Sequence, residues 1–193
     1  MRLYTAINLL LEANLLNEHI LNVGKFQDRY RKEDYIDKVI DMLEKSYAAI
    51  GGIKGIDRDE LMDDKVFWKV VRLDGKVVAC MVYKFSIYGR KIVCGGTDGS
   101  PAGKAGFKMI MNEDKKMCDR IMCWTEVSGA PKHIYEKIGL PKIPLKSAVK
   151  ILADLGKTIE EPGKEDPGYS YVRMIGGQPL EKTMFGFCPD KYC

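Results

Sequence analysis

The sequence TDGSPAGKAGF at residues 97–107 places three glycines around one lysine, directly before an apolar and charged run. When a strand ends in such a turn and a helix follows, unpaired backbone N–H groups point at one spot with the positive end of the helix dipole behind them, a geometry that binds phosphate. Lys104 would add a cation. Gly99, Gly103 and Gly106 would let the backbone approach an anion closely, and the small Ala105 would leave space at the start of the helix. The stretch is neither a P-loop nor a dinucleotide-binding fingerprint, and a flexible surface loop is the alternative interpretation.

A second stretch, CWTEVSGAPKHIYEKIGL at residues 123–140, couples a strand to a short helix that carries Tyr135. Together the two stretches resemble the GNAT superfamily of acyl-CoA-dependent N-acyltransferases. In that family a Q/R-x-x-G-x-G/A segment opens a helix and holds the coenzyme A pyrophosphate, and one strand later a helix of the form L-Y-E-K-x-G-F presents a tyrosine to the coenzyme's sulfur. HIYEKIGL matches the second pattern, and SPAGKA at residues 100–105 matches the first in its glycine and alanine.

The resemblance covers residues 35–140 and implies that acetyl-CoA is the co-substrate. Ser100 stands where the family usually has glutamine or arginine, and Ser128 stands where an asparagine often precedes the tyrosine helix. Backbone N–H groups near Gly95 and Gly96 are the implied donors to the oxyanion. The residues implied to contact the coenzyme are Gly95, Gly99, Ser100, Gly103, Lys104, Ala105, Gly106 and Ser128.

Acyl transfer from a thioester to an amine requires a deprotonated amine, a stabilised oxyanion and a proton for the departing thiolate. The resemblance implies that Tyr135 supplies this proton as general acid, which suits a phenol that is a hydrogen-bond donor at neutral pH. Glu126, on the preceding strand, is the candidate that accepts the amine's proton, directly or through water. The alternatives are a core-capping aromatic for Tyr135 and a solvated strand-end carboxylate for Glu126. His133 is expected to be a surface or loop-packing residue and not the base.

The late segment YSYVRMIGGQPLEKTMFG is not explained by the coenzyme motifs. The candidate substrate contacts, expected on strands that would border the acceptor side, are Tyr169, Tyr171, Arg173 and Lys182. Alternating exposed polar positions are an equally simple interpretation. The acceptor amine could belong to a protein lysine or N-terminus, a small molecule or a nucleobase, and the sequence does not choose among these.

A sheet with flanking helices must position these groups. A helix is predicted from Asp34, which can cap its start, to Gly51 or Gly52. Asp74-Gly75 predicts a hairpin, RKIVCGGTD a third strand, and FKMIMNEDKKMC a helix whose crossover makes two strands parallel. With the resemblance, the predicted fold class is α/β: a GNAT-like mixed, mostly antiparallel central sheet flanked by helices, with an N-terminal accessory helix.

The N-terminal sequence MRLYTAINLLLEA resembles the capsid-targeting peptides of internal head proteins of large tailed phages, with cleavage expected after Glu12. The predicted organisation is residues 1–31 as accessory helix and linker, with the targeting peptide at 1–12, and residues 32–193 as a GNAT-like domain with an insertion at 141–167. This implies a phage capsid or host protein as partner, and packaging in a phage head with delivery to the host cytoplasm. It also supplies an alternative function, an internal virion or ejected structural protein with a vestigial fold and no catalysis.

The composition of the chain restricts the classes of ligand and cellular location that we expect for the protein. The 31 basic and 27 acidic residues are interspersed, so the net charge of +4 does not indicate a nucleic-acid surface. The six cysteines form no C-x-x-C pair and there are two histidines, so no metal site is expected. No apolar run is long enough to cross a bilayer and no signal-peptide cleavage site is evident. We expect a cytoplasmic protein in a reducing compartment that does not bind a membrane.

Overall fold

The computed structural model describes most of the chain, in two compact units. Unit 1 comprises Met1–Phe85 and Ile92–Glu113, and unit 2 comprises Ser86–Lys91 and Asp114–Cys193. The described residues are 20–23, 29–49, 57–86, 89–118, 122–129, 132–137 and 139–188. The predicted targeting peptide at 1–12 therefore lies outside them. The predicted division of the chain near residue 31 stays a prediction.

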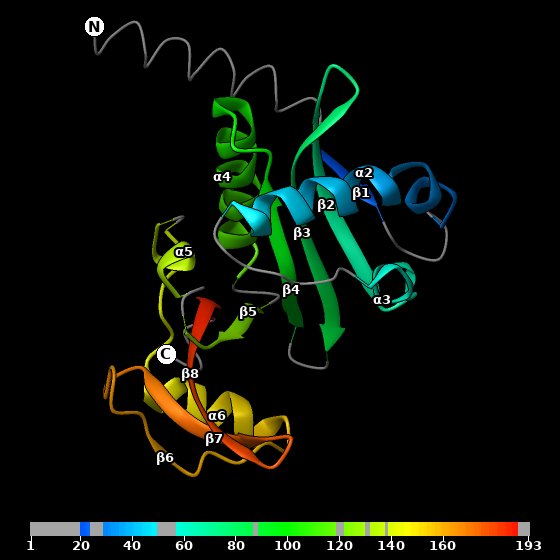
Figure 1. Ribbon diagram of the computed structural model, residues 1–193. Coiled ribbons are helices and arrows are strands. Elements are labelled where there is room, and N and C mark those ends of the chain that lie inside the picture. Colours follow the sequence, from blue (N-terminus) through cyan, green and yellow to red (C-terminus); the bar gives the residue numbers. More distant parts are fainter. Residues whose placement is uncertain are drawn as a thin grey trace, which may run out of the picture. The chain divides into compact units, whose positions relative to one another are not determined.

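The sheet of unit 1 has the strand order β1-β2-β3-β4 (Figure 1). The first two strand pairs, β1/β2 and β2/β3, are antiparallel. Strand β4 also contributes its first residues to unit 2. The strands are β1 (Ile20–Val23), β2 (Val66–Leu73), β3 (Lys76–Ser86) and β4 (Gly89–Thr97). Strand β1 was not predicted, because it lies within the segment expected to be accessory helix and linker.

The predicted hairpin is confirmed at the turn between β2 and β3. Asp74 has φ 50° and Gly75 has φ 77°, the pair of left-handed conformations that a two-residue type I′ turn requires. This turn matches the right-handed twist of the two long strands that it joins. A local sequence signal was therefore enough to fix the pairing of β2 with β3.

Helices cover both faces of the unit 1 sheet. Residues of α2 and α3 pack with Trp68, Val70 and Val82, which alternate along one face. Helix α4 packs closely on the opposite face, since a Cβ at Gly106 would lie 2.9 Å from Cγ1 of Val71. The helices are α2 (Arg29–Ala48), α3 (Arg58–Met62) and α4 (Pro101–Lys116).

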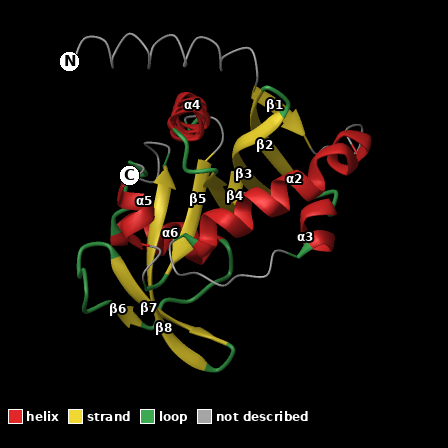
Figure 2. Ribbon diagram, turned by 45° about the horizontal axis from the view of Figure 1, so that its top comes forward, coloured by secondary structure: helices red, strands yellow, loops and turns green. Residues whose placement is uncertain are grey.

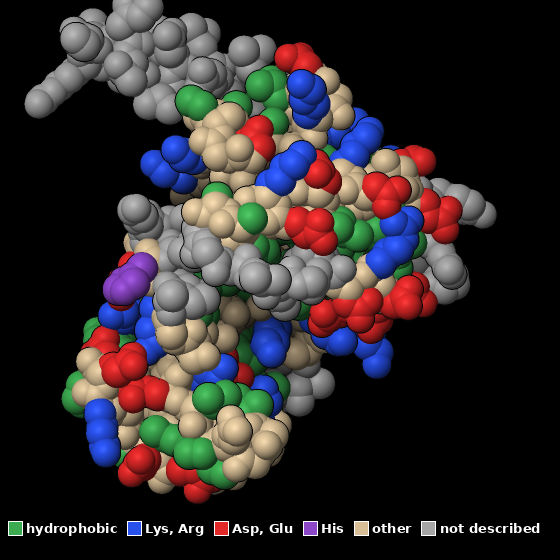
Figure 3. Space-filling model, viewed as in Figure 1, with side chains coloured by type: hydrophobic (Ala, Val, Ile, Leu, Met, Phe, Trp, Pro, Cys, Tyr) green, Lys and Arg blue, Asp and Glu red, His purple; other side chains and the backbone are tan. Residues whose placement is uncertain are grey.

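Helix α2 begins at Arg29, five residues before the predicted start at Asp34. Its first turn is charged in sequence but contains the buried Lys32, whose Nζ donates to the carbonyl oxygens of Leu61 at 3.2 Å and Asp63 at 2.8 Å. These acceptors lie about thirty residues away in the chain, so the contact could not be anticipated from helical periodicity. In the view of Figure 3, acidic and basic side chains are interspersed over α2 and α3.

The sheet of unit 2 continues from the start of β4 in the order β4-β5-β8-β7-β6. Gly89–Lys91 pairs in parallel with residues 122–124 of β5, as the predicted crossover requires, and β5/β8, β8/β7 and β7/β6 are antiparallel. The strands are β5 (Met122–Val127), β6 (Glu161–Pro162), β7 (Ser170–Ile175) and β8 (Gln178–Phe187).

Two helices belong to unit 2, α5 (Lys132–Lys137) and α6 (Leu145–Asp154). Helix α6 buries Ile151 and Leu152 against Trp124 and Met184 on one face of the sheet. The predicted fold class, a mixed and mostly antiparallel sheet flanked by helices, is confirmed (Figure 2). The segment predicted to be an insertion at 141–167 contains α6 and β6.

Candidate functional site

The predicted phosphate-binding stretch forms the end of β4 and the start of α4. Asp98 follows the strand and its N–H donates to the carbonyl oxygen of Val78 at 3.0 Å. Gly99 has φ 82° and begins the turn. Helix α4 then starts at Pro101, so most of the predicted loop lies inside the helix. The helix predicted to begin at Phe107 begins six residues earlier, so Gly103, Lys104, Ala105 and Gly106 occupy its first two turns.

Ser100 and Asp98 cap the start of α4. The N–H and the hydroxyl of Ser100 donate to Oδ1 of Asp98 at 2.9 and 2.6 Å. The N–H of Gly103 donates to Oγ of Ser100 at 2.9 Å, and the N–H of Lys104 to the Ser100 carbonyl oxygen at 3.0 Å. Ser100 is thus an N-cap residue. Asp98 places a negative charge at the positive end of the helix dipole, where a phosphate would also bind.

Close packing explains two of the glycines in this stretch. A Cβ at Gly103 would lie 2.3 Å from Oδ1 of Asp98 and 2.6 Å from the carbonyl oxygen of Val78. A Cβ at Gly106 would meet Val71 on β2, as described above. A Cβ at Gly99, in contrast, would meet nothing within 4 Å. The space beside Gly99 is therefore open. The side chain of Lys104, later in the same stretch, is exposed.

The remaining predicted coenzyme contact of unit 1 is Gly95, in the middle of β4. A Cβ there would lie 3.2 Å from the carbonyl oxygen of Cys80 on β3 and 3.2 Å from Cε2 of Phe107 on α4. Its neighbour Gly96 packs against Ser46 of α2, because a Cβ would lie 2.6 Å from the Ser46 hydroxyl oxygen. Both glycines let helices approach the strand closely.

In unit 2 the strand register gathers Glu126, Ser128, Tyr171 and Arg173 on one face of the sheet. Glu126 of β5 pairs in register with Met184 of β8, and Tyr171 of β7 pairs with Lys182 of β8. Because alternate residues of a strand share a face, these side chains point to the same side.

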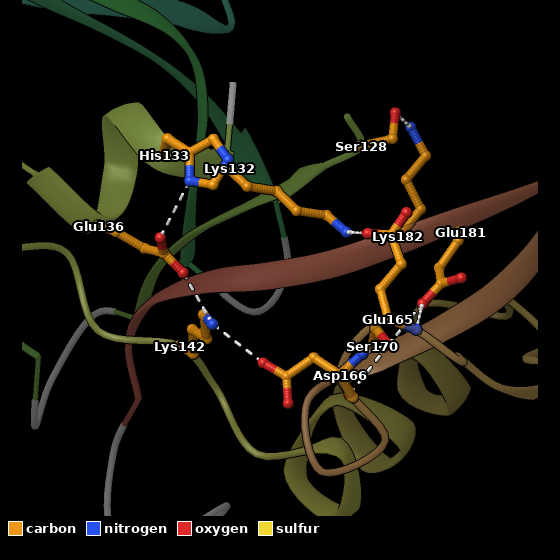
Figure 4. Close-up of polar contacts among 10 residues, drawn as sticks. All are labelled: Ser128, Lys132, His133, Glu136, Lys142, Glu165, Asp166, Ser170, Glu181 and Lys182. Carbon is orange, nitrogen blue, oxygen red and sulfur yellow. Dashed lines mark hydrogen bonds and ion pairs between the residues drawn. The ribbon is translucent and has the colours of Figure 1, made fainter. Parts of the chain in front are cut away.

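Glu126 is the centre of this group. Its carboxylate accepts hydrogen bonds from the Tyr171 hydroxyl at 3.2 Å, from the Arg173 guanidinium, and from Nζ of Lys157 at 3.3 Å. Lys182 donates from Nζ to Oγ of Ser128 at 3.1 Å, a contact drawn in Figure 4. Glu126, the predicted proton acceptor, therefore shares one network with Tyr171 and Arg173, the predicted substrate contacts.

The surroundings of Glu126 determine its basicity. Its side chain is 7% exposed, and burial alone would raise its pKa, but the hydrogen bond from Arg173 and the charges of Lys157 and Arg173 lower the pKa on balance. Burial, followed by the charge of Glu126, raises the pKa of the Tyr171 hydroxyl. A carboxylate whose pKa is lowered is a weak base, so this geometry favours an anchoring role for Glu126 over proton acceptance.

Tyr135 lies on the short helix α5, half-buried, with its ring 5.6 Å from that of Phe185 between centroids. Phe185 follows Met184 on β8 and so points to the opposite face of the sheet. Tyr135 and Glu126 therefore lie on opposite faces, and the structure does not bring the predicted acid and the predicted base together.

Ion pairs hold α5 to the segment at 139–169 (Figure 4). Lys132 contacts Glu165, and Nζ of Lys142 lies 2.7 Å from Oε1 of Glu136 and 2.9 Å from Oδ2 of Asp166. The side chain of His133, on the same helix, is 87% exposed, which confirms the prediction that it is a surface residue.

Two basic residues near Glu126 were missed in the sequence. Lys91 pairs in register with Trp124 on β5, and its Nζ lies 5.8 Å from the Trp124 ring centroid. Lys157 follows α6 and lies 5.6 Å from the same centroid. The alternation of side chains in RKIVCGG could have indicated which face of the strand carries Lys91. No local sequence pattern indicates that Lys157 lies near Glu126.

Comparison with known proteins found similarity in structure alone. No family model and no curated protein matches this chain. The ribosomal-protein-S18-alanine N-acetyltransferase from Escherichia coli is similar with 10% sequence identity and a TM-score of 0.46, covering 88% of this chain and 94% of that chain. An N-acetyltransferase from Staphylococcus aureus Mu50 has 8% identity and a TM-score of 0.48, covering 88% of this chain and 96% of that chain.

An acetyltransferase from Bacillus subtilis in complex with CoA has 13% identity and a TM-score of 0.43, and covers 79% of this chain and 91% of that chain. Each likeness concerns the chain trace. None of the described helices is long and apolar enough to cross a membrane. In the described part of the chain, no group of three or more His, Cys, Asp or Glu residues is arranged to hold a metal ion.

Proposed function

We propose that this chain is an N-acetyltransferase that moves an acetyl group from acetyl-CoA to an amine by direct attack, with Tyr135 as general acid. The observation that supports it is the structural context of the two motifs. The glycine-rich stretch lies between strand β4 and helix α4, β5 pairs in parallel with β4, and α5 with Tyr135 comes next. A motif gains weight as evidence when the strand and helix context that its chemistry needs is present.

Three features at the start of α4 favour the binding of a pyrophosphate, and one feature disfavours it. The helix dipole, the open space beside Gly99 and the exposed Lys104 favour an anion there. The carboxylate of Asp98 opposes it. We propose that the backbone from Gly99 to Gly106 and Lys104 hold the coenzyme, with Ser100 as the cap of the helix that receives it.

The chemical step follows from the groups present. The amine nitrogen attacks the thioester carbonyl carbon, the C–N bond forms, the C–S bond breaks, and the thiolate takes the proton of the Tyr135 hydroxyl. Backbone N–H groups near Gly95 are the proposed donors to the oxyanion. The amine's proton leaves to water, since Glu126 is a weak base.

Thermal unfolding with acetyl-CoA tests the proposal. A ligand that binds only the folded state raises the melting temperature, so saturating acetyl-CoA should raise it and acetyl phosphate, which lacks the nucleotide, should not. An unchanged melting temperature contradicts the proposal. That result would favour the alternative, a virion or ejected protein without catalysis, which agrees with the internal capping of α4 by Asp98 and the ion pairing of Glu126.

A further inference from the structure

One face of the unit 2 sheet carries more positive charge than its acidic groups balance. Four basic residues surround Trp124 and Glu126 there, and they come from four separate segments of the chain. The cationic cluster consists of Lys91 on β4, Lys157 after α6, Arg173 on β7 and Lys182 on β8. In the described part of the chain, Glu126 is the one carboxylate that pairs with any of them.

Burial and neighbouring cations lower the pKa of two of these lysines. Burial, followed by the charge of Lys157, lowers the pKa of Lys91. Burial also lowers the pKa of Lys182, against the attraction of Glu126. Charged groups taken out of water are costly unless they are paired. One carboxylate for four cations leaves a net positive site that an anion would stabilise.

Two buried N–H groups in the same place have no hydrogen-bond partner among the described residues. They are Nε1 of Trp124 and Nε of Arg173. Trp124 is 1% exposed, and buried donors of this kind nearly always have an acceptor. The other tryptophan, Trp68, shows the usual situation, because its Nε1 donates to the carbonyl oxygen of Leu61 at 3.2 Å.

Solvent reaches the charged side chains of the site, whereas Nε1 of Trp124 and Nε of Arg173 are enclosed. The side chains of Lys157 and Arg173 are 32% and 12% exposed, so the cationic cluster forms the edge of the buried region and not its interior. Phosphate and carboxylate groups offer negative charge and several acceptor oxygens, which are what the unbalanced cations and unpaired donors lack.

We propose that the cationic cluster binds the phosphate or carboxylate group of the acceptor, so that the acceptor is an amine that also carries an anionic group. The role of the bound amine as acetyl acceptor rests on the proposed acetyl transfer, whereas the binding of an anion by this face does not. The cluster lies on the face that carries Tyr171 and Arg173, the predicted substrate contacts, and a bound anion would hold the amine by its far end.

The indole N–H signals of the two tryptophans in a ¹H–¹⁵N NMR spectrum test the binding without acetyl-CoA. The probes are phosphoethanolamine, β-alanine and ethanolamine, which are primary amines with a phosphate, a carboxylate and no anionic group. The Trp124 signal, assigned with Trp124→Phe, should shift with one or both anionic amines and not with ethanolamine. The Trp68 signal should not move. The two anionic probes distinguish phosphate from carboxylate recognition.

Matched charge-removing variants locate the site. Lys157→Met should weaken binding of the effective probe about tenfold, the usual effect of losing one charge-assisted contact. Lys150→Met removes the same charge from an exposed position on α6 and should change the affinity less than about twofold. A Trp124 signal that no probe shifts, or equal weakening by the two variants, overturns the proposal. These outcomes do not depend on whether acetyl-CoA raises the melting temperature, so the two proposals can fail separately.

Discussion

Arg173 of β7 and Glu126 of β5 form an ion pair that reaches across β8, the strand between theirs in the sheet. Both side chains are largely buried, at 12% and 7% exposed. The pair therefore ties three strands together through side chains in addition to their backbone hydrogen bonds. It also explains why the carboxylate is a poor base.

Replacing Glu126 with glutamine should destabilise unit 2 at neutral pH. The variant leaves the buried Arg173 without its counter-ion, and breaking a buried pair costs about 3 kcal/mol. The pKa of Glu126 is lower in the folded protein than its ordinary value of 4.5, so its contribution is present above that value and is lost as the pH falls through the folded pKa. Urea unfolding at pH 7 and pH 3 should show a difference between wild type and Glu126→Gln that shrinks at the lower pH. A difference that is independent of pH would contradict this account.

Replacing Asp98 with asparagine should strengthen acetyl-CoA binding. Asparagine keeps an acceptor for Ser100 and removes the negative charge at the start of α4, an effect of about twofold to fivefold in affinity for a charge near a helix terminus. Isothermal titration calorimetry with acetyl-CoA measures it. The control Asp64→Asn removes the same charge from an exposed position after α3 and should leave the affinity unchanged. Weaker binding by Asp98→Asn alone would show that the carboxylate assists the ligand.

Replacing Tyr135 with phenylalanine should lower turnover about a hundredfold, the usual contribution of a general acid, with little change in acetyl-CoA affinity. The ring contact with Phe185 is kept, so the helix should remain in place. Steady-state kinetics and calorimetry separate the two effects. Tyr47→Phe, on α2 of unit 1, removes a hydroxyl elsewhere and serves as the matched control. Equal turnover in wild type and Tyr135→Phe would remove Tyr135 as the acid.

Replacing Gly103 with alanine should destabilise the protein by about 2 kcal/mol, the range of overpacking in a tight contact. The new Cβ would meet a backbone carbonyl oxygen of β3 that cannot move aside freely. Gly99→Ala fills open space but keeps φ 82°, so it should cost about 1 kcal/mol from backbone strain alone. Urea unfolding compares them without any ligand. If Gly99→Ala is the more damaging variant, close packing is not the reason for glycine at 103.

The parts of the structure that were predictable depend on neighbouring residues in the chain. The hairpin follows from Asp74-Gly75 alone, and the order from β4 to α5 follows from periodicity and glycines. Helix α2 was predicted to start too late because its first turn is stabilised by Lys32, whose acceptors come from another segment.

In the candidate site, too, single residues were predictable and contacts between distant segments were not. Glu126, Tyr171 and Arg173 were recognised one by one from residue type and strand position. Their common network was not predictable, because it depends on the order β5-β8-β7 and on Lys157, which reaches Glu126 from beyond α6. The capping of α4 was not predicted, because the glycines were interpreted as positions where the backbone can approach a ligand. At Gly103, a glycine is needed because Asp98 and β3 leave no space for a Cβ.

Helix α5 has six residues, too few for a helix to persist in water without outside support. Its support includes the ion pairs of Lys132 and Glu136 with the segment at 139–169. The segment predicted to be an insertion thus supports the helix that carries Tyr135. Lys142 and Glu165 therefore help to position Tyr135 without contacting that residue's side chain in the ion pairs they form.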